Sequence, residues 1–567
     1  MPPSAVGRHN GHSVRASNHR RLLPAATIAA VLLLVAVSVQ SVWWTPLNVD
    51  EELTLRLAQF SFRNVFHIVS TERGGGPVHF WLEHFLQGWW PGLEALRLPS
   101  LLFACLALPA VALIARELVG DEGGAAVVLL LAVSPIPVMY ATFGRPHTLL
   151  FAWLMWGTVL ALRAAREGSR PLWILAGVVL GLTVFVHPTA PLYALTAFAS
   201  AVVFVPRSPR SVIRETWPGA LALLLAFVPY YLRTLHVLGD RYGVGTAKAG
   251  GRTFTGRPVW DDAIHFLAPG RAVINFFTAL AIIGIVALIV RKDSRVVAFC
   301  AITIAAPILF FSFVPANGDS ALFFDRYMIP ATPAFLVLVV AGARAIGSWA
   351  GGARLLVIAI LVAGLVGIEL RYVDHRREQQ QGIGLDAVTH AVASSPHGSV
   401  LFGSTGTSGA FFSSFDYGHP ANLLDHYLSL RLDSVQLVDD DSCSGALPYV
   451  TGPPTARPGV WVFYAASPEE AAAARTALRL PGVTVHEVRG HYFVVNSRTP
   501  LAPRAAIRLG QALRIAWRRA APLNRRVNEL LQADRQLLRV PPACRPYGEL
   551  GDPGISPHWP PVKTTHQ

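Results

Sequence analysis

A series of long apolar runs is the feature that most constrains the fold of this chain. The first, 22–44, is long enough to cross the ~30 Å hydrocarbon core of a bilayer as an α-helix. Only 14% of the residues are charged and the mean hydropathy is +0.43, which excludes a disordered chain and a single soluble globular enzyme. Further runs lie near 97–115, 124–141, 147–163, 171–187, 190–205, 217–235, 271–290, 296–314, 327–344 and 354–370. We therefore expect a multi-pass α-helical membrane protein with about eleven transmembrane helices.

Arginines mark one side of the predicted membrane segments. They occur in the polar N-terminal segment 1–21, which we expect to be a disordered tail, and in alternate short gaps between the apolar runs. Because short Arg-rich loops face the cytoplasm, this pattern places the N-terminus in the cytoplasm of a cell membrane protein and the C-terminal region outside it. The net charge of +14 lies largely in these short gaps, which argues against a nucleic-acid partner.

The sequence divides into a polytopic domain, 22–371, and a more polar C-terminal part. The polytopic domain includes a large first outer loop, 45–96. Residues 372–500 have the composition of a small extracytoplasmic α/β domain, and 501–567 form a basic, then Pro-rich, extension. In an oxidising exterior, Cys443 and Cys544 could form a disulfide. Within the α/β domain we predict helices over 386–393 and 468–478 and strands over 399–402, 459–465 and 484–495.

Unusual polar residues gather at the outward-facing ends of the apolar runs. Asp50 and Glu51 follow the first run and open a predicted amphipathic helix over 51–66. Taken alone, Asp50 could be an ordinary helix N-cap, and arginines at such boundaries often reach toward the headgroups without any further role. The other polar residues at this side are Arg145, His147, His187, Arg241, Asp325 and Arg326.

The order of short motifs around these residues carries a family resemblance. Asp50-Glu51 is followed by Gly76-Pro77-Val78, by Arg97-Leu98-Pro99 and by Arg145-Pro146-His147; His187 and Arg326-Tyr327-Met328-Ile329-Pro330 come later. This ordered set resembles the GT-C glycosyltransferases of the protein O-mannosyltransferase and aminoarabinose-transferase kind, over about residues 22–345. Three departures stand out: the usual Pro-Pro-Leu is replaced by Gly76-Pro77-Val78, His147 stands where Tyr is common, and a third acid, Glu52, extends the acidic pair.

The resemblance implies an inverting sugar transfer at the outer face of the membrane. The donor would be a polyprenyl-phosphate-linked sugar, and the acceptor a hydroxyl of a glycan, a lipid or a protein. Asp50 would act as general base, with Glu51 beside it in the acidic pair. The donor phosphate would be held by Arg145, Arg326 and Arg241. His147, His187, Asp325 and Tyr327 are the remaining substrate-site candidates.

A divalent metal ion is a further candidate component of the first outer loop. His79 and Glu83 have the i,i+4 spacing that places two side chains on one face of a helix, and some members of the family bind a metal near the acidic pair. The alternative is that both side chains are satisfied within the membrane interface without a metal.

Two other functions fit a polytopic protein of this size. A transporter or flippase of lipid-linked cell-envelope intermediates would carry ionisable residues near the middle of its spans. A non-catalytic assembly partner would need no acidic pair at all. The placement of the ionisable residues at one boundary, and the presence of Asp50 and Glu51, favour the enzyme.

Overall fold

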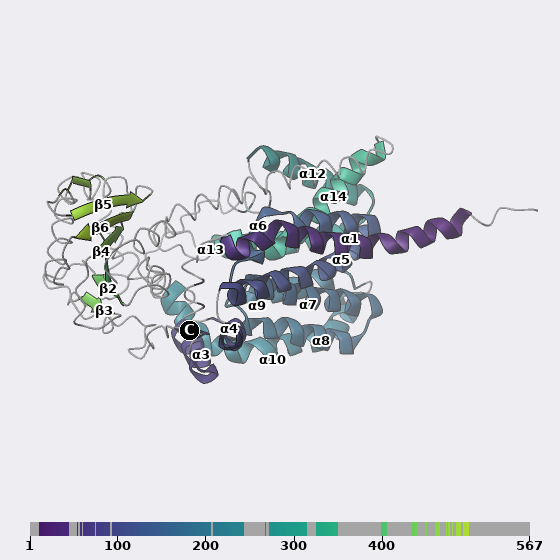
Figure 1. Cartoon of the computed structure of the whole chain (residues 1–567). Coiled ribbons are helices and arrows are strands. Elements are labelled where there is room, and N and C mark those ends of the chain that lie inside the picture. The colour runs from purple at the N-terminus through teal and green to yellow at the C-terminus, as the bar shows by residue number, and fades with distance from the viewer. Residues whose placement is uncertain are drawn as a thin grey trace, which may run out of the picture. The chain divides into compact units, whose positions relative to one another are not determined.

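A computed structural model of the chain contains two units, one made of helices and one built around a β-sheet (Figure 1). The helical unit comprises Met1–Trp44 and Phe62–Val373, and the second unit comprises Thr45–Ser61 and Asp374–Gln567. The structure describes residues 11–44, 51, 54, 57–58, 60–73, 75–90, 93–205, 208–242, 263, 267, 271–313, 325–349, 399–404, 434–438, 448–450, 460–464, 472, 475–476, 479, 483–488 and 492–497.

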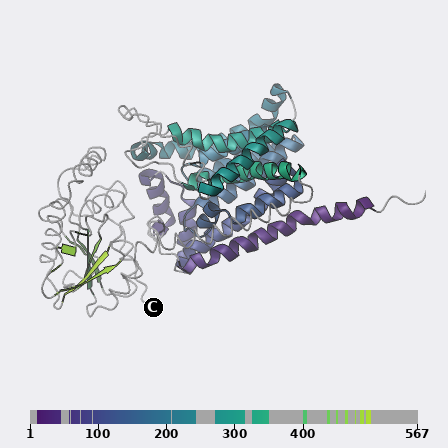
Figure 2. The ribbon, with the colours of Figure 1, turned by 90° about the horizontal axis from the view of Figure 1, so that it is seen from above.

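Long apolar helices make up the helical unit, most of them roughly aligned with one another (Figures 1 and 2). Among the described residues, six helices are long and apolar enough to cross a membrane, and three shorter apolar helices accompany them. The predicted runs between 22 and 344 fall on these helices, whereas 354–370 lies outside the described residues. The helices are α1 (Gly11–Trp44), α5 (Leu93–Ala132), α6 (Pro135–Ala141), α7 (His147–Glu167), α8 (Arg170–Gly181), α9 (Ala190–Val202), α10 (Pro209–Tyr242), α12 (Arg271–Val290), α13 (Ser294–Phe313) and α14 (Thr332–Trp349).

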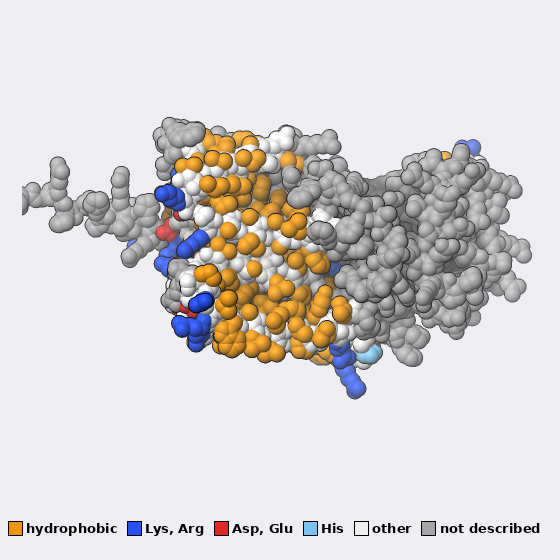
Figure 3. Space-filling view, turned by 180° about the vertical axis from the view of Figure 1, so that it is seen from behind, with side chains coloured by type: hydrophobic (Ala, Val, Ile, Leu, Met, Phe, Trp, Pro, Cys, Tyr) orange, Lys and Arg blue, Asp and Glu red, His pale blue; other side chains and the backbone are white. Residues whose placement is uncertain are grey.

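The outer surface of these helices is apolar over a broad band (Figure 3). Leu102, Leu225, Ile282 and Val286 are among the large hydrophobic side chains that these helices expose. Lys and Arg side chains gather along one edge of the band in the same view. An apolar belt bordered by basic residues is the surface expected of a protein whose helices contact lipid tails.

Helix α5 contains a sharp break at Gly120. This glycine has φ 79° and ψ 174°, a backbone conformation that residues with a side chain rarely adopt. Arg116 and Asp121 form an ion pair of 3.0 Å across the break. The two arms of α5 correspond to the predicted run 97–115 and to the first part of the run 124–141, whose remainder falls on α6. The arms pack side by side, because a Cβ on Gly124 would lie 3.1 Å from the Ala112 carbonyl oxygen.

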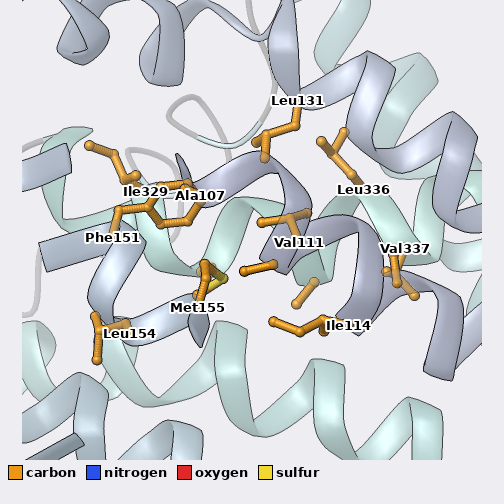
Figure 4. Close-up of a cluster of buried hydrophobic side chains, with 14 of the residues drawn as sticks. Ala107, Val111, Ile114, Leu131, Phe151, Leu154, Met155, Ile329, Leu336 and Val337 are labelled. Carbon is orange, nitrogen blue, oxygen red and sulfur yellow. The ribbon is translucent and has the colours of Figure 1, made fainter. Parts of the chain in front are cut away.

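Hydrophobic side chains from α5, α7 and α14 form the centre of the helical unit (Figure 4). Val111 of α5, Leu154 of α7 and Val337 of α14 are almost fully buried in this cluster. Elsewhere the helices approach even more closely: a Cβ on Gly177 of α8 would lie 2.0 Å from the carbonyl oxygen of Gly219 on α10. Small residues allow this backbone contact, which is typical of helices packed within membranes.

Between Phe62 and Trp89 the chain forms short helices that lie at one end of the long ones (Figures 1 and 2). They are α3 (Phe62–Ile68), the π-helical turn η1 (Val69–Arg73) and α4 (Val78–Trp89). The prediction of one continuous helix over 51–66 is wrong, because Phe60 and Ser61 are not helical and Phe60 donates its backbone N–H to the Leu57 carbonyl, 3.2 Å away. Helix α4 is amphipathic, with His79, Phe80 and Glu83 buried and Phe85 and Trp89 exposed.

The second unit contains a six-stranded mixed sheet in the order β3-β2-β1-β4-β6-β5. Strand β1 pairs in parallel with β2 and β4, and the remaining pairs are antiparallel. The predicted single strand over 484–495 is instead two antiparallel strands, β5 and β6. The predicted helix over 386–393 lies outside the described residues. The strands are β1 (Ser399–Ser404), β2 (Ser434–Val438), β3 (Pro448–Val450), β4 (Val460–Tyr464), β5 (Val483–Val488) and β6 (Tyr492–Ser497).

Candidate active site

The turn between α6 and α7 carries Arg145 and ends at His147, the first residue of α7. Ser100 of α5 donates its hydroxyl to the Phe143 carbonyl, 2.7 Å away, and the backbone N–H of Arg145 donates to the same carbonyl at 2.6 Å. The first bond holds the turn against α5, and the second closes the turn itself. The ring of His147 lies parallel to that of Phe143, with 6.4 Å between the ring centroids, and its side chain is buried.

His187 lies in the turn that joins the 3-10 helix η2 (Leu182–Phe185) to α9. The backbone N–H of Thr189 donates to Nδ1 of His187 at 3.2 Å, and the Thr189 hydroxyl lies 2.8 Å from the same nitrogen. Because a backbone N–H can only donate, Nδ1 is the acceptor and the proton of the neutral ring belongs on Nε2. The turn therefore presents an N–H donor at the far edge of the imidazole.

Arg326 and Tyr327 lie on the 3-10 helix η4 (Asp325–Ala331), which leads into α14. The Tyr193 hydroxyl of α9 donates to the Tyr327 carbonyl at 2.8 Å, and the Tyr327 ring stacks on Phe311 with 4.5 Å between centroids. The Arg326 guanidinium lies 5.7 Å from the centroid of the Tyr327 ring, a cation–π distance. These contacts fix η4 between α9 and α13.

These segments bring five of the predicted site residues into one cluster. The rings of His147 and His187 are 5.3 Å apart, and those of His187 and Tyr327 are 6.4 Å apart, centroid to centroid. The charges of Arg145 and Arg326 both lie within electrostatic range of His147. We call Arg145, His147, His187, Arg326 and Tyr327 the polar cluster. Its two guanidinium groups and the His187 N–H make it a site suited to an anion.

His79 borders the polar cluster from α4. Its side chain is only 3% exposed, and its ring donates a hydrogen bond to the Gly144 carbonyl in the turn that carries Arg145. Burial and the nearby charge of Arg145 lower the pKa of His79 to about 3, against the opposing effect of the Gly144 bond. The ring is therefore neutral at physiological pH.

The approach of α4 to this region depends on a glycine. A Cβ on Gly76 would lie 2.3 Å from the backbone carbon of Phe185, at the end of η2. The neighbouring Gly75 carbonyl accepts a hydrogen bond from the Tyr230 hydroxyl of α10, at 2.7 Å. The Gly-rich segment thus packs its backbone directly on η2 and α10, which positions His79 at the start of α4.

The predicted metal site has incomplete support. Glu83 is fully buried one turn after His79 on α4, as the i,i+4 spacing requires. The described residues contain no group of three or more His, Cys, Asp or Glu side chains placed to hold a metal ion. A divalent metal at His79 and Glu83 therefore stays a prediction.

Several other predicted residues lie outside this geometry. Asp50 is outside the described residues, and the side chains of Arg241, at the end of α10, and Asp325, at the start of η4, are likewise not described. Glu51 is helical and buried but belongs to the second unit. The predicted Cys443–Cys544 pair also falls outside the described part of the chain.

Arg97 is a buried cation that sequence reasoning did not assign to the site. It is completely buried near the start of α5 and donates through Nη1 to the Val42 carbonyl at 3.0 Å, in the last turn of α1. This bond holds the end of α1, six residues before the acidic pair begins, against α5. The motif Arg97-Leu98-Pro99 contains this arginine, but the motif was taken only as part of the family resemblance.

Comparison with known proteins identifies the class of this architecture. Residues 76–232 match the model of a family described as dolichyl-phosphate-mannose-protein mannosyltransferase, a stretch that includes His79, Arg145, His147 and His187. The structure of ArnT from Cupriavidus metallidurans bound to undecaprenyl phosphate is similar, with a TM-score of 0.51 and 14% identity, covering 84% of this chain and 99% of that chain. For the apo structure of the same ArnT, the TM-score is 0.50, the identity 15% and the coverage 84% and 100%. Comparison with curated proteins finds no match.

These matches confirm the resemblance that the motifs predicted. The chain is a multi-pass membrane protein that shares the fold of ArnT, and its residues 76–232 match the mannosyltransferase family model. It is similar to the dolichyl-phosphate-mannose-protein mannosyltransferases over 76–232 and to ArnT in fold.

Proposed function

We propose that the protein is an inverting glycosyltransferase that moves a sugar from a polyprenyl-phosphate donor to an acceptor hydroxyl. The observation that carries this proposal is the geometry of the polar cluster: the His187 ring lies 5.3 Å from the ring of His147, two residues after Arg145, and 6.4 Å from that of Tyr327, next to Arg326. A lipid phosphate gains negative charge as the sugar leaves it. Fixed guanidinium groups stabilise this leaving group more in the transition state than in the ground state.

An apolar cavity near the polar cluster is a second observation in favour of a lipid-linked donor. The cavity lies between six helical elements, with a lining that includes Val111 of α5, Met155 of α7, Tyr193 of α9, Phe299 of α13, Pro330 of η4 and Val337 of α14. An isoprenoid chain is matched by walls of this kind, and the phosphate at its head by the cations of the polar cluster. ArnT, which shares the fold, has been crystallised with undecaprenyl phosphate.

Asp50 is the general base in this proposal. The acceptor hydroxyl of a glycan, lipid or protein must lose its proton as it attacks the anomeric carbon, and a carboxylate can take that proton. Attack opposite the departing phosphate inverts the anomeric configuration. Glu51, its neighbour in the sequence, completes the acidic pair.

We propose that the reaction takes place at the outer face of the cell membrane. His147 is the first residue of α7, and the exposed Arg163 and Arg166, with 68% and 71% of their side-chain surface accessible, lie near the other end of that helix. A helix of 21 residues spans about 30 Å, so the polar cluster and these arginines lie on opposite sides of the bilayer. The positive-inside rule assigns the arginine side, and with it the N-terminus, to the cytoplasm.

The decisive experiment is transfer from defined donors by membranes containing the protein. A panel of polyprenyl-phosphate sugars carrying mannose, glucose, galactose or arabinose is offered with acceptor extracts from the native host. Asp50→Asn should abolish transfer at unchanged protein level, while Glu52→Gln, the same change of charge two residues away, should retain it. Transfer by Asp50→Asn at the wild-type rate would remove Asp50 from the mechanism, and movement of the intact donor across vesicles would indicate a flippase instead.

A further inference from the structure

His79 presents a buried nitrogen that has no partner among the described residues. Its ring is 3% exposed, and Nε2 is completely inaccessible to solvent and lacks a hydrogen bond within the described part of the chain. The bond to the Gly144 carbonyl must therefore be made by Nδ1. Buried polar atoms in native proteins are nearly always satisfied, so an unsatisfied one points to a bound water or ligand.

The Gly144 bond also decides what kind of partner Nε2 needs. A neutral imidazole carries one N–H, and a carbonyl oxygen can only accept. With the proton on Nδ1, Nε2 keeps a bare lone pair that accepts a hydrogen bond.

The position of His79 is next to the groups expected to hold the donor. It bonds to the turn that carries Arg145, and it lies within electrostatic range of His147. Nε2 of His147 is itself buried without a hydrogen bond among the described residues. A phosphate has no proton to offer to a bare nitrogen at neutral pH, whereas the sugar attached to that phosphate has several hydroxyl groups.

We propose that Nε2 of His79 accepts a hydrogen bond from a hydroxyl of the sugar that is being transferred. This rests on the proposed function, and it adds a specificity-determining residue to it. The cations of the polar cluster bind the phosphate, which every donor shares. His79 distinguishes one sugar from another through the hydrogen bond to its hydroxyl. A site built to pair with a hydroxyl discriminates strongly against an analogue that lacks it, because the buried lone pair is then left unsatisfied.

Two substitutions separate this role from a structural one. In His79→Asn the side-chain amide sits at the position of Nδ1, so the bond to the Gly144 carbonyl is retained and the distal acceptor is lost. In His79→Gln the amide sits at the position of Nε2, so an acceptor oxygen is retained and the Gly144 bond is lost. His84→Gln is the matched control on the same helix, since the His84 ring packs on Phe62 at 4.8 Å between centroids.

The experiment measures two quantities for each purified variant in nanodiscs. One is the affinity for polyprenyl phosphate without a sugar, and the other is kcat/KM for the sugar donor that the wild type transfers and for its monodeoxy forms. We expect wild type and His79→Gln to prefer the full sugar over one monodeoxy form by at least 10-fold. We expect His79→Asn to lose that preference while binding bare polyprenyl phosphate within about twofold of wild type. His84→Gln should match wild type in both.

Three results would overturn the inference. If both His79 variants bind bare polyprenyl phosphate more weakly and keep the preference among sugars, His79 only positions Arg145. If a chelator abolishes wild-type transfer and zinc restores it in wild type but not in His79→Asn, Nε2 is a metal ligand. If His79→Asn keeps the preference for the full sugar, the hydroxyl contact lies elsewhere, although the transferase proposal stands. Absence of transfer from every donor of the panel in wild type would end the proposed function itself.

Discussion

The imidazole rings of His147 and His187 lie 5.3 Å apart, centroid to centroid, although one begins α7 and the other precedes α9. Their approach brings the turn that carries Arg145 next to the turn in which Thr189 donates a hydrogen bond to His187. Arg326 reaches the same place from η4. Three segments that are separate in the sequence, the start of α7, the turn before α9 and η4, therefore meet at the polar cluster.

Arg326 should be required for turnover more than for folding. Removing a fixed cation that stabilises a departing phosphate costs on the order of 10²-fold in kcat. We therefore expect Arg326→Ala to lower transfer by about that factor, with Arg326→Lys intermediate, because an ammonium keeps the charge but not the planar fork. Arg163→Ala, at the other end of α7, is the control. A loss below threefold in Arg326→Ala would mean that this side chain only reaches toward the lipid headgroups.

The tautomer of His187 can be tested with amide replacements. Since the backbone N–H of Thr189 donates to Nδ1 of His187, the N–H that His187 can donate to a ligand is on Nε2. We expect His187→Gln, whose amide NH2 lies at the Nε2 position, to retain at least 10-fold more transfer than His187→Asn. Equal activities of these two variants would contradict the assignment, and circular dichroism of both would show that neither had unfolded.

The two glycines Gly76 and Gly88 should respond oppositely to alanine. A Cβ at Gly76 would meet the Phe185 backbone at 2.3 Å, so the chain must shift and move His79 with it. At Gly88, within α4, a Cβ would meet nothing within 4 Å, and alanine is favoured over glycine in a helix by up to about 1 kcal/mol. Thermal unfolding in detergent should therefore show a lower midpoint for Gly76→Ala and an equal or higher one for Gly88→Ala. Unchanged stability and transfer in Gly76→Ala would be inconsistent with this backbone contact.

The low pKa of His79 makes stability depend on pH in a defined window. Above pH 6.5 the ring is neutral in both the folded and the unfolded chain. Between pH 6.5 and about 3 only the unfolded chain takes up the proton, so this residue destabilises the fold as the pH falls. At pH 5 the effect amounts to about 2 kcal/mol. On going from pH 7 to 5, the unfolding midpoint of wild type should fall more than that of His79→Asn; parallel profiles would show that the buried ring is not held neutral.

The sequence was informative about the polar cluster because topology alone brings its members to one side. Arg145, His147, His187 and Arg326 each stand at the end of a predicted span, and alternate span ends must share a face of the bilayer. The register of those ends was not predictable, since it depends on how deeply each helix sits and on contacts such as the bond from Tyr193 to the Tyr327 carbonyl.

The errors have equally physical causes. Arg97 is flanked by Leu96 and Leu98 at a span boundary, a pattern that also describes an arginine reaching for headgroups, and only packing shows that it is buried against Val42. The alternation of apolar residues across 484–495 continues through a point where the chain turns back. An alternation with a period of two indicates which face of the sheet each residue occupies, but it does not indicate where a strand ends.

The hydrogen bond between Tyr193 and the Tyr327 carbonyl has a mechanical consequence. It ties the helix that follows His187 to the short helix that carries Arg326. A displacement of one of these two segments is therefore passed on to the other, so His187 and Arg326 should shift together rather than independently.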